Sequence, residues 1–140
     1  YLVPIGKAKV VVEGEHLTLV SHSRMVNLCK KVVEEFSKRG IRIELIDLRT
    51  IKPLDITTVA NSVRKTHNVV LVEEGHIFSG ICAEVGFEIQ EHCFDFLDAP
   101  IARVTQCETP MPYSKTLEKQ TMPTEERITQ AIMETLCLLP

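Results

Sequence analysis

The chain has 140 residues, of which 44% are hydrophobic and 25% are charged, a balance that is ordinary for one globular domain. Its formal net charge of −3 gives no electrostatic reason to expect nucleic acid or an anionic membrane as a partner. No apolar run approaches the roughly 20 residues that a membrane-spanning helix needs. The five cysteines include no CxxC pair, so neither a disulfide framework nor a zinc site is indicated.

The opening segment, YLVPIGKAKVVVEG, has the pattern of neither a signal peptide nor a transit peptide. It also lacks an initiator methionine. The chain therefore has the pattern of an excised or processed piece of a longer protein.

Strand and helix patterns alternate from residue 16 onward. Short apolar strands are predicted at 16–21 and 41–48. The helix between them begins near Ser23, whose side-chain oxygen is expected to cap it, and ends before Gly40. Its buried stripe, spaced three to four residues apart, comprises Val26, Cys29, Val33 and Phe36.

The second half continues the alternation. Asp55 is expected to cap a helix that follows Pro53. The next strand, VVLV at 69–72, is apolar without alternation, which indicates burial on both faces. A helix follows Gly80, and Gly86 within it indicates close packing against a neighbour.

The last part of the chain contains one more strand and one more helix. The strand is predicted at 101–104, and the helix begins near Thr124. A proline-punctuated loop at 109–123 separates them. Strand–helix units of this length imply right-handed crossovers and a mostly parallel sheet with helices on both faces.

Three groups of polar residues follow the predicted strands, at the edge where such sheets bind ligands. They are Ser21-His22-Ser23, Asp47-Leu48-Arg49 and Glu73-Glu74-Gly75-His76. The third group could serve acid–base chemistry or bind a metal. In the alternative interpretation, Glu73 and Glu74 end a strand at the surface and His76 lies in a loop. Gly75 and Gly80 offer at most a weak phosphate cradle, and no GxGxxG, GxxxxGK[ST] or HExxH motif is present.

Several separated blocks resemble one known family. They are VPIGKA at 3–8, IELIDLRTIKPLD at 43–55, VVLVEEG at 69–75, DAPIARVT at 98–105 and PMPYSKTLE at 110–118. In this order they resemble the carboxy-terminal, transketolase C-terminal-like domain of pyruvate dehydrogenase beta subunits. The resemblance implies a three-layer α/β/α sandwich with a sheet of about five strands, of which the first is an antiparallel edge strand. It also implies that residues 1–14 are the entry segment from an upstream thiamine-binding domain and that residues 15–140 form the domain itself.

The same resemblance implies that the catalytic machinery lies elsewhere. In this family the upstream domain of the beta subunit supplies the glutamate that activates thiamine diphosphate, and the alpha subunit holds the diphosphate and Mg²⁺. We therefore expect no catalytic, cofactor-binding or metal-binding residue in this chain, which alone would bind neither the cofactor nor the metal. The expected partners are the alpha subunit, a second beta subunit and the dihydrolipoyl acetyltransferase core.

The resemblance also implies that two residues contact that core. In the family, the aspartate of the FLDAP motif and the terminal carboxylate contact a basic patch on the acetyltransferase's subunit-binding domain. These positions correspond to Asp98 and Pro140, although the tail CLLP departs from the polar or aromatic ends of the family. From the residue types alone, Asp98 is equally a turn aspartate that accepts local hydrogen bonds.

Three alternatives remain open at this point. The first is the branched-chain 2-oxoacid dehydrogenase beta subunit, which shares the IDLRTI-type block. The second is another thiamine enzyme, such as transketolase or deoxyxylulose-phosphate synthase. The third is a freestanding α/β domain that binds a small ligand at the edge formed by residues 73–80. For location, the mitochondrial matrix is expected, with the plastid and the bacterial cytoplasm as alternatives.

Overall fold

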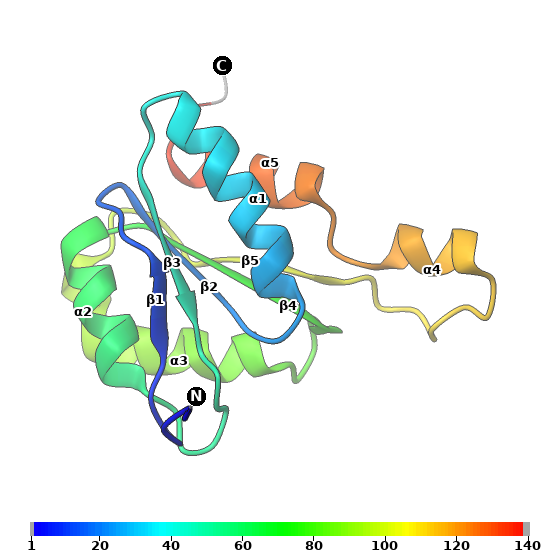
Figure 1. Cartoon of the computed structure of the whole chain (residues 1–140), viewed down its shortest axis with the longest axis horizontal. Coiled ribbons are helices and arrows are strands. Elements are labelled where there is room, and N and C mark those ends of the chain that lie inside the picture. The colour runs from blue at the N-terminus through cyan, green and yellow to red at the C-terminus, as the bar shows by residue number, and fades with distance from the viewer. Residues whose placement is uncertain (1, 139–140) are drawn as a thin grey trace.

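The computed structural model describes residues 2–138, which fold around a five-stranded sheet (Figure 1). The elements are β1 (Lys9–Val12), β2 (Leu17–Ser21), α1 (Met25–Lys38), β3 (Ile43–Asp47), α2 (Ile56–Thr66), β4 (Val69–His76), α3 (Ile81–Cys93), the 3-10 helix η1 (Phe94–Phe96), β5 (Ala102–Gln106), α4 (Lys115–Thr121) and α5 (Glu125–Thr135). Within residues 2–138, no helix is both long and apolar enough to cross a membrane.

The strand order is β1-β3-β2-β4-β5. β1 pairs antiparallel with β3, and all other pairs are parallel. The predicted fold class, with one antiparallel edge strand, is therefore confirmed. The position of that strand was not predicted: Lys9–Val12 lies inside the segment expected to be a connection, whereas the strand expected to come first is interior and parallel.

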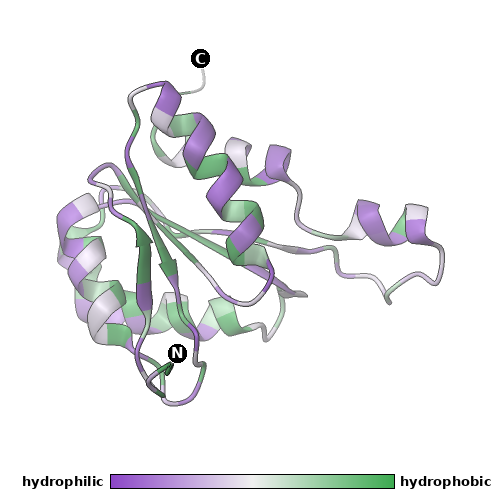
Figure 2. Cartoon of the chain, viewed as in Figure 1, coloured by the Kyte–Doolittle hydropathy of each residue, from purple (hydrophilic) through white to green (hydrophobic). Residues whose placement is uncertain are grey.

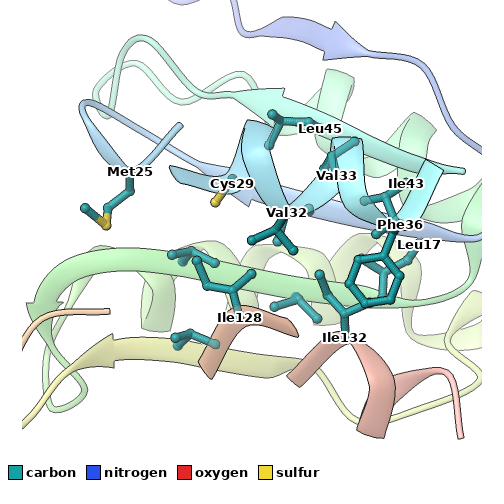
Figure 3. Packing of buried hydrophobic residues seen from close by; sticks show 14 of the residues in the cluster. Leu17, Met25, Cys29, Val32, Val33, Phe36, Ile43, Leu45, Ile128 and Ile132 are labelled. Carbon is teal, nitrogen blue, oxygen red and sulfur yellow. The ribbon is translucent and has the colours of Figure 1, made fainter. Parts of the chain in front are cut away.

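Helices cover both faces of the sheet. α1 and α5 pack on one face, where Leu17 and Leu45 of the strands belong to the same buried cluster as Phe36 of α1 and Ile132 of α5 (Figure 3). α2 and α3 pack on the other face, against residues such as Leu71. Figure 2 shows hydrophobic residues along the central strands and hydrophilic residues on the outer sides of the helices.

Strand β4 runs through the centre of both cores. Val70 and Val72 point to the layer of α1 and α5, while Val69 and Leu71 point to that of α2 and α3, and all four are fully buried. The prediction from the non-alternating VVLV pattern is thus confirmed. Burial on both faces makes β4 the rigid support from which the chain continues to α3.

The predicted caps are mostly correct. Gly40 has a φ of +78° just beyond α1, and the Asp55 and Thr124 side chains accept hydrogen bonds at the starts of α2 and α5. The predicted Ser23 cap is wrong. α1 begins after Arg24 without a side-chain cap, and it is the backbone carbonyl of Ser23 that accepts from Val26 N–H, at 3.3 Å.

Candidate docking surface

The polar groups after β2 and β3 lie side by side, as expected for parallel strands, but they are engaged with each other. Ser21 pairs with Asp47 in the ladder, and the Ser21 hydroxyl donates to Val72 O at 2.9 Å. Asp47 Oδ1 accepts from Arg49 N–H at 3.0 Å. The Ser21 hydroxyl and Asp47 Oδ1 are therefore both used by hydrogen bonds within the domain.

Glu73 is not the surface residue that the simpler interpretation expected. Its side chain is 1% exposed and accepts from Ile81 N–H at 2.9 Å and from Cys82 N–H at 3.1 Å. A buried carboxylate is tolerated here because the free N–H groups at the start of α3 satisfy it. Burial, together with this neighbouring carboxylate, raises the pKa of the Cys82 thiol. Glu73 thus has a structural role, as the anion that completes α3.

The suggested phosphate cradle at Gly75 and Gly80 is occupied by the same carboxylate. A Cβ atom built on Gly80 would overlap Glu73 Oε1 and lie 2.5 Å from His76 O. A Cβ on Gly75 would lie 3.0 Å from Glu73 Oε2. These glycines make room for Glu73 rather than for a bound phosphate, which removes the structural basis of the freestanding ligand-binding alternative.

The remaining groups of this edge do not converge either. Glu74 forms an ion pair with Arg24, and His76 ends β4 at the surface, in register with Gln106. His22 Nε2 is buried without a hydrogen-bond partner. Across residues 2–138, no three His, Cys, Asp or Glu side chains are grouped so that they could hold a metal ion.

A large open depression lies on the outer side of α3. We call it the α3 groove, and it has a volume of about 920 Å³. Its walls come from α3, η1 and the segment leading into β5. The lining residues are Cys82, Ala83, Gly86, Phe87, Gln90, Phe94, Leu97, Asp98, Ala99, Pro100, Ile101 and Arg103.

The α3 groove exposes aromatic surface. Phe87 and Phe94 are 60% and 65% exposed, and neighbouring Phe96 is 42% exposed. Gly86 in the floor is not required by packing inside the domain, because a Cβ there would lie 3.6 Å from Leu71 Cδ1, an ordinary contact. Grouped apolar exposure of this kind marks surfaces that other molecules cover.

Asp98, the residue assigned to docking by resemblance, is exposed and lies in the wall of this groove. The loop that carries it is fixed by the end of α2. Asp98 N–H donates to His67 O at 3.0 Å, and the preceding Phe96 carbonyl accepts from His67 Nδ1 at 2.7 Å. The second assigned residue, Pro140, lies outside the described residues.

Residues 107–123 form what we call the α4 arm, which extends away from the body of the domain (Figure 1). The sequence predicted a loop here and missed the short helix α4. Met111 and Leu117 are each 50% exposed, and Tyr113 is fully exposed. The arm therefore does not fold back as a lid over the domain, and its apolar side chains face outward.

Comparison with known proteins finds a matching family and solved structures with a similar fold. Residues 6–128 match the family described as "Transketolase, C-terminal domain". Among solved structures, a split-gene transketolase in an inactive beta4 tetramer aligns with a TM-score of 0.78 and 22% identity, covering 97% of this chain and 43% of that chain. At this identity the match supports the fold alone.

Relatives found by sequence are more similar to this chain than that structure is. The mitochondrial pyruvate dehydrogenase E1 component subunit beta of Dictyostelium discoideum is 49% identical over 94% of this chain, and those of Bos taurus and Homo sapiens are 47% and 46% identical over 97%. The chain spans only 37% or 38% of the length of these relatives. The resemblance inferred from the separated sequence blocks is thereby confirmed.

Proposed function

Because the chain belongs to the transketolase C-terminal domain family, we propose that it is the assembly and docking domain of a pyruvate dehydrogenase beta subunit. The observation that carries this proposal is the position of Asp98. The residue that the family resemblance assigns to docking is exposed in the wall of an apolar groove, where a partner can reach it. The 46–49% identity to mitochondrial beta subunits supports the proposal.

The complete enzyme would decarboxylate pyruvate with thiamine diphosphate and pass the acetyl group to lipoyl groups. The described residues do not fit that cofactor. The N-terminus of α3, where a phosphate could bind, is filled by Glu73, and residues 2–138 offer no grouping of metal ligands. The cofactor would be held by the upstream domain and the alpha subunit, and this domain would contribute no catalytic residue.

The proposed partners follow from the surfaces. The apolar face of α3 is suited to a second beta subunit, and the exposed α4 arm to the alpha subunit. The subunit-binding domain of dihydrolipoyl acetyltransferase would present a Lys or Arg to Asp98. The names of the relatives support the mitochondrial matrix as the location.

Docking can be tested in the assembled enzyme with two matched substitutions. Asp98→Asn removes the charge from the groove wall, and Asp95→Asn removes a charge that is also exposed from η1, outside the residues that line the groove. Binding to an immobilised subunit-binding domain is measured at two salt concentrations. We expect Asp98→Asn to weaken binding by about 2 kcal/mol, mainly through faster dissociation, because it leaves a desolvated cation unpaired.

The control, Asp95→Asn, should change only the association rate and its salt dependence. Unchanged affinity of the Asp98→Asn enzyme at both salt concentrations would show that Asp98 is only a turn residue. Equal losses for both variants would show that docking responds to the general charge of this surface.

A further inference from the structure

The loop that presents Asp98 is held by a residue distant in sequence. Leu97 N–H closes η1 by donating to Phe94 O at 3.2 Å, but the next N–H, that of Asp98, donates to His67 O at 3.0 Å. The Asp98 side chain therefore starts from a backbone that is fixed to the end of α2. Its direction depends on where His67 lies.

The His67 ring adds two further contacts to the same loop. Its Nδ1 is 2.7 Å from Phe96 O, and because a carbonyl oxygen can only accept, Nδ1 carries the hydrogen. The ring also stacks on that of Phe96, with centroids 6.5 Å apart and planes inclined by 24°. One imidazole thus holds both the backbone and the side chain of the residue two positions before Asp98.

Arg64, one turn earlier on α2, contacts the same segment. Its guanidinium lies 5.8 Å from the centre of the Phe96 ring and donates to His92 O at 3.2 Å. This contact is to an exposed ring, whereas the His67 contacts reach the backbone on both sides of Leu97. His67 is therefore the main link between α2 and the loop.

The backbone of His67 limits what can replace it. His67 follows α2 with a φ of +62°, and its N–H donates to Val63 O at 2.8 Å. Left-handed geometry is tolerated by glycine and asparagine with little cost. Asparagine also places an N–H₂ group near the position of Nδ1, so glycine and asparagine differ in the donor while both fit the backbone.

We propose that His67 is a positioning residue for docking: its imidazole fixes the Phe96–Asp98 loop and so aims the Asp98 carboxylate at the cation of the partner. This inference rests on the proposed docking function. According to this inference, the end of α2 contributes to partner recognition, although His67 itself does not line the α3 groove.

The test uses assembled full-length enzyme and the immobilised subunit-binding domain of dihydrolipoyl acetyltransferase as the probe. His67→Gly should weaken binding about five- to tenfold, the effect of one lost hydrogen bond. His67→Asn should stay within about twofold of the wild type, because its amide restores the donor. In an Asp98→Asn background, His67→Gly should cause no further loss, since both changes act on one interaction.

Each of the other outcomes refutes a stated part of these proposals. If Asp98→Asn weakens binding but His67→Gly does not, the positioning role is wrong and the docking proposal stands. If the losses from His67→Gly and Asp98→Asn multiply, His67 acts independently of Asp98 and the inference is overturned. If Asp98→Asn has no effect, both the docking proposal and the role of His67 are refuted. Equal losses for the Gly and Asn variants would show that the donor is irrelevant.

Discussion

Asp55 shows how a single carboxylate connects two parts of the chain. Its Oδ1 accepts from Thr58 N–H at 3.3 Å and so caps α2, while its Oδ2 accepts from Ala8 N–H at 3.0 Å. Burial alone would raise the pKa of Asp55, but the hydrogen bonds from Thr58 and Ala8 outweigh it and hold the pKa below its usual value. The charged form is therefore the one that the fold stabilises.

Substituting Asp55 with Asn separates these two functions. Asparagine remains a good cap, but its N–H₂ group would face the Ala8 N–H, so the domain should lose about 1–3 kcal/mol of stability at neutral pH. Urea unfolding of Asp55→Asn, with Asp95→Asn as an exposed control, measures the loss. A variant as stable as the wild type would show that the link to Ala8 contributes nothing.

The stabilities of the wild type and of Asp55→Asn should respond differently to acid. A lowered pKa in the folded state gives stability that is present above the unfolded value of about 3.9 and is lost as the pH falls through the folded value. The difference in unfolding free energy between wild type and Asp55→Asn should therefore shrink below about pH 4. A difference that stays constant down to pH 3 would contradict this assignment.

Prediction from sequence worked best for residues whose role is local. Asp55 was identified as a cap, and Thr124 as the start of a helix, because these signals depend only on the next few residues. The burial of Glu73 could not be predicted, since its partners belong to the N-terminus of α3, which only the fold brings close. His67 was missed for the same reason: Phe96, its partner, lies 29 residues away, and the only signal was a histidine directly after a helix.

At the scale of elements, the interior strands, the edge strand β5 and the amphipathic helices were predicted, whereas the edge strand β1 and the short helix α4 were not. VVLV in β4 and the apolar stripe of α1 reflect burial directly. β1 has no fully buried residue, and its pairing with β3 is a long-range contact. α4 has seven residues and one buried side chain, Thr121, so it shows almost no amphipathic pattern.

Gly86 in helix α3 allows a test at this scale of where the helix packs closely. Sequence reasoning explained Gly86 by close packing, but inside the domain a methyl group fits there at an ordinary distance. Gly86→Ala should therefore stabilise the domain by about 0.5–1 kcal/mol, because alanine favours the helix. If the packing partner is instead a second beta subunit, the same substitution should weaken self-association.

Thermal unfolding and sedimentation of the same Gly86→Ala samples distinguish these effects. The expected result is a domain that melts at a higher temperature and dissociates at a higher concentration than the wild type. A less stable domain would point to packing within the chain. Unchanged association would place the subunit contact elsewhere, with the exposed α4 arm as the next region to test.

At the scale of the whole molecule, the domain separates a rigid core from the surfaces that we assign to partners. The core is the sheet with its two helical layers, and it contains the fully buried residues of β2, β3 and β4. Two exposed aromatic residues, Phe87 and Phe94, line the α3 groove, and the α4 arm, which carries the exposed Tyr113, extends from another part of the domain. The buried core and these exposed surfaces are therefore separate parts of the domain.

The central claim is that the wall of the α3 groove formed by residues 94–103, including Asp98, is the surface on which the acetyltransferase core docks. Hydrogen–deuterium exchange of the assembled enzyme, with and without the subunit-binding domain, tests it most directly. We predict slower exchange in peptides covering residues 94–103 and no change in residues 73–80, where the Glu73 carboxylate is already hydrogen-bonded to the start of α3. Protection confined to residues 73–80 or to the α4 arm, with residues 94–103 unchanged, would contradict the account.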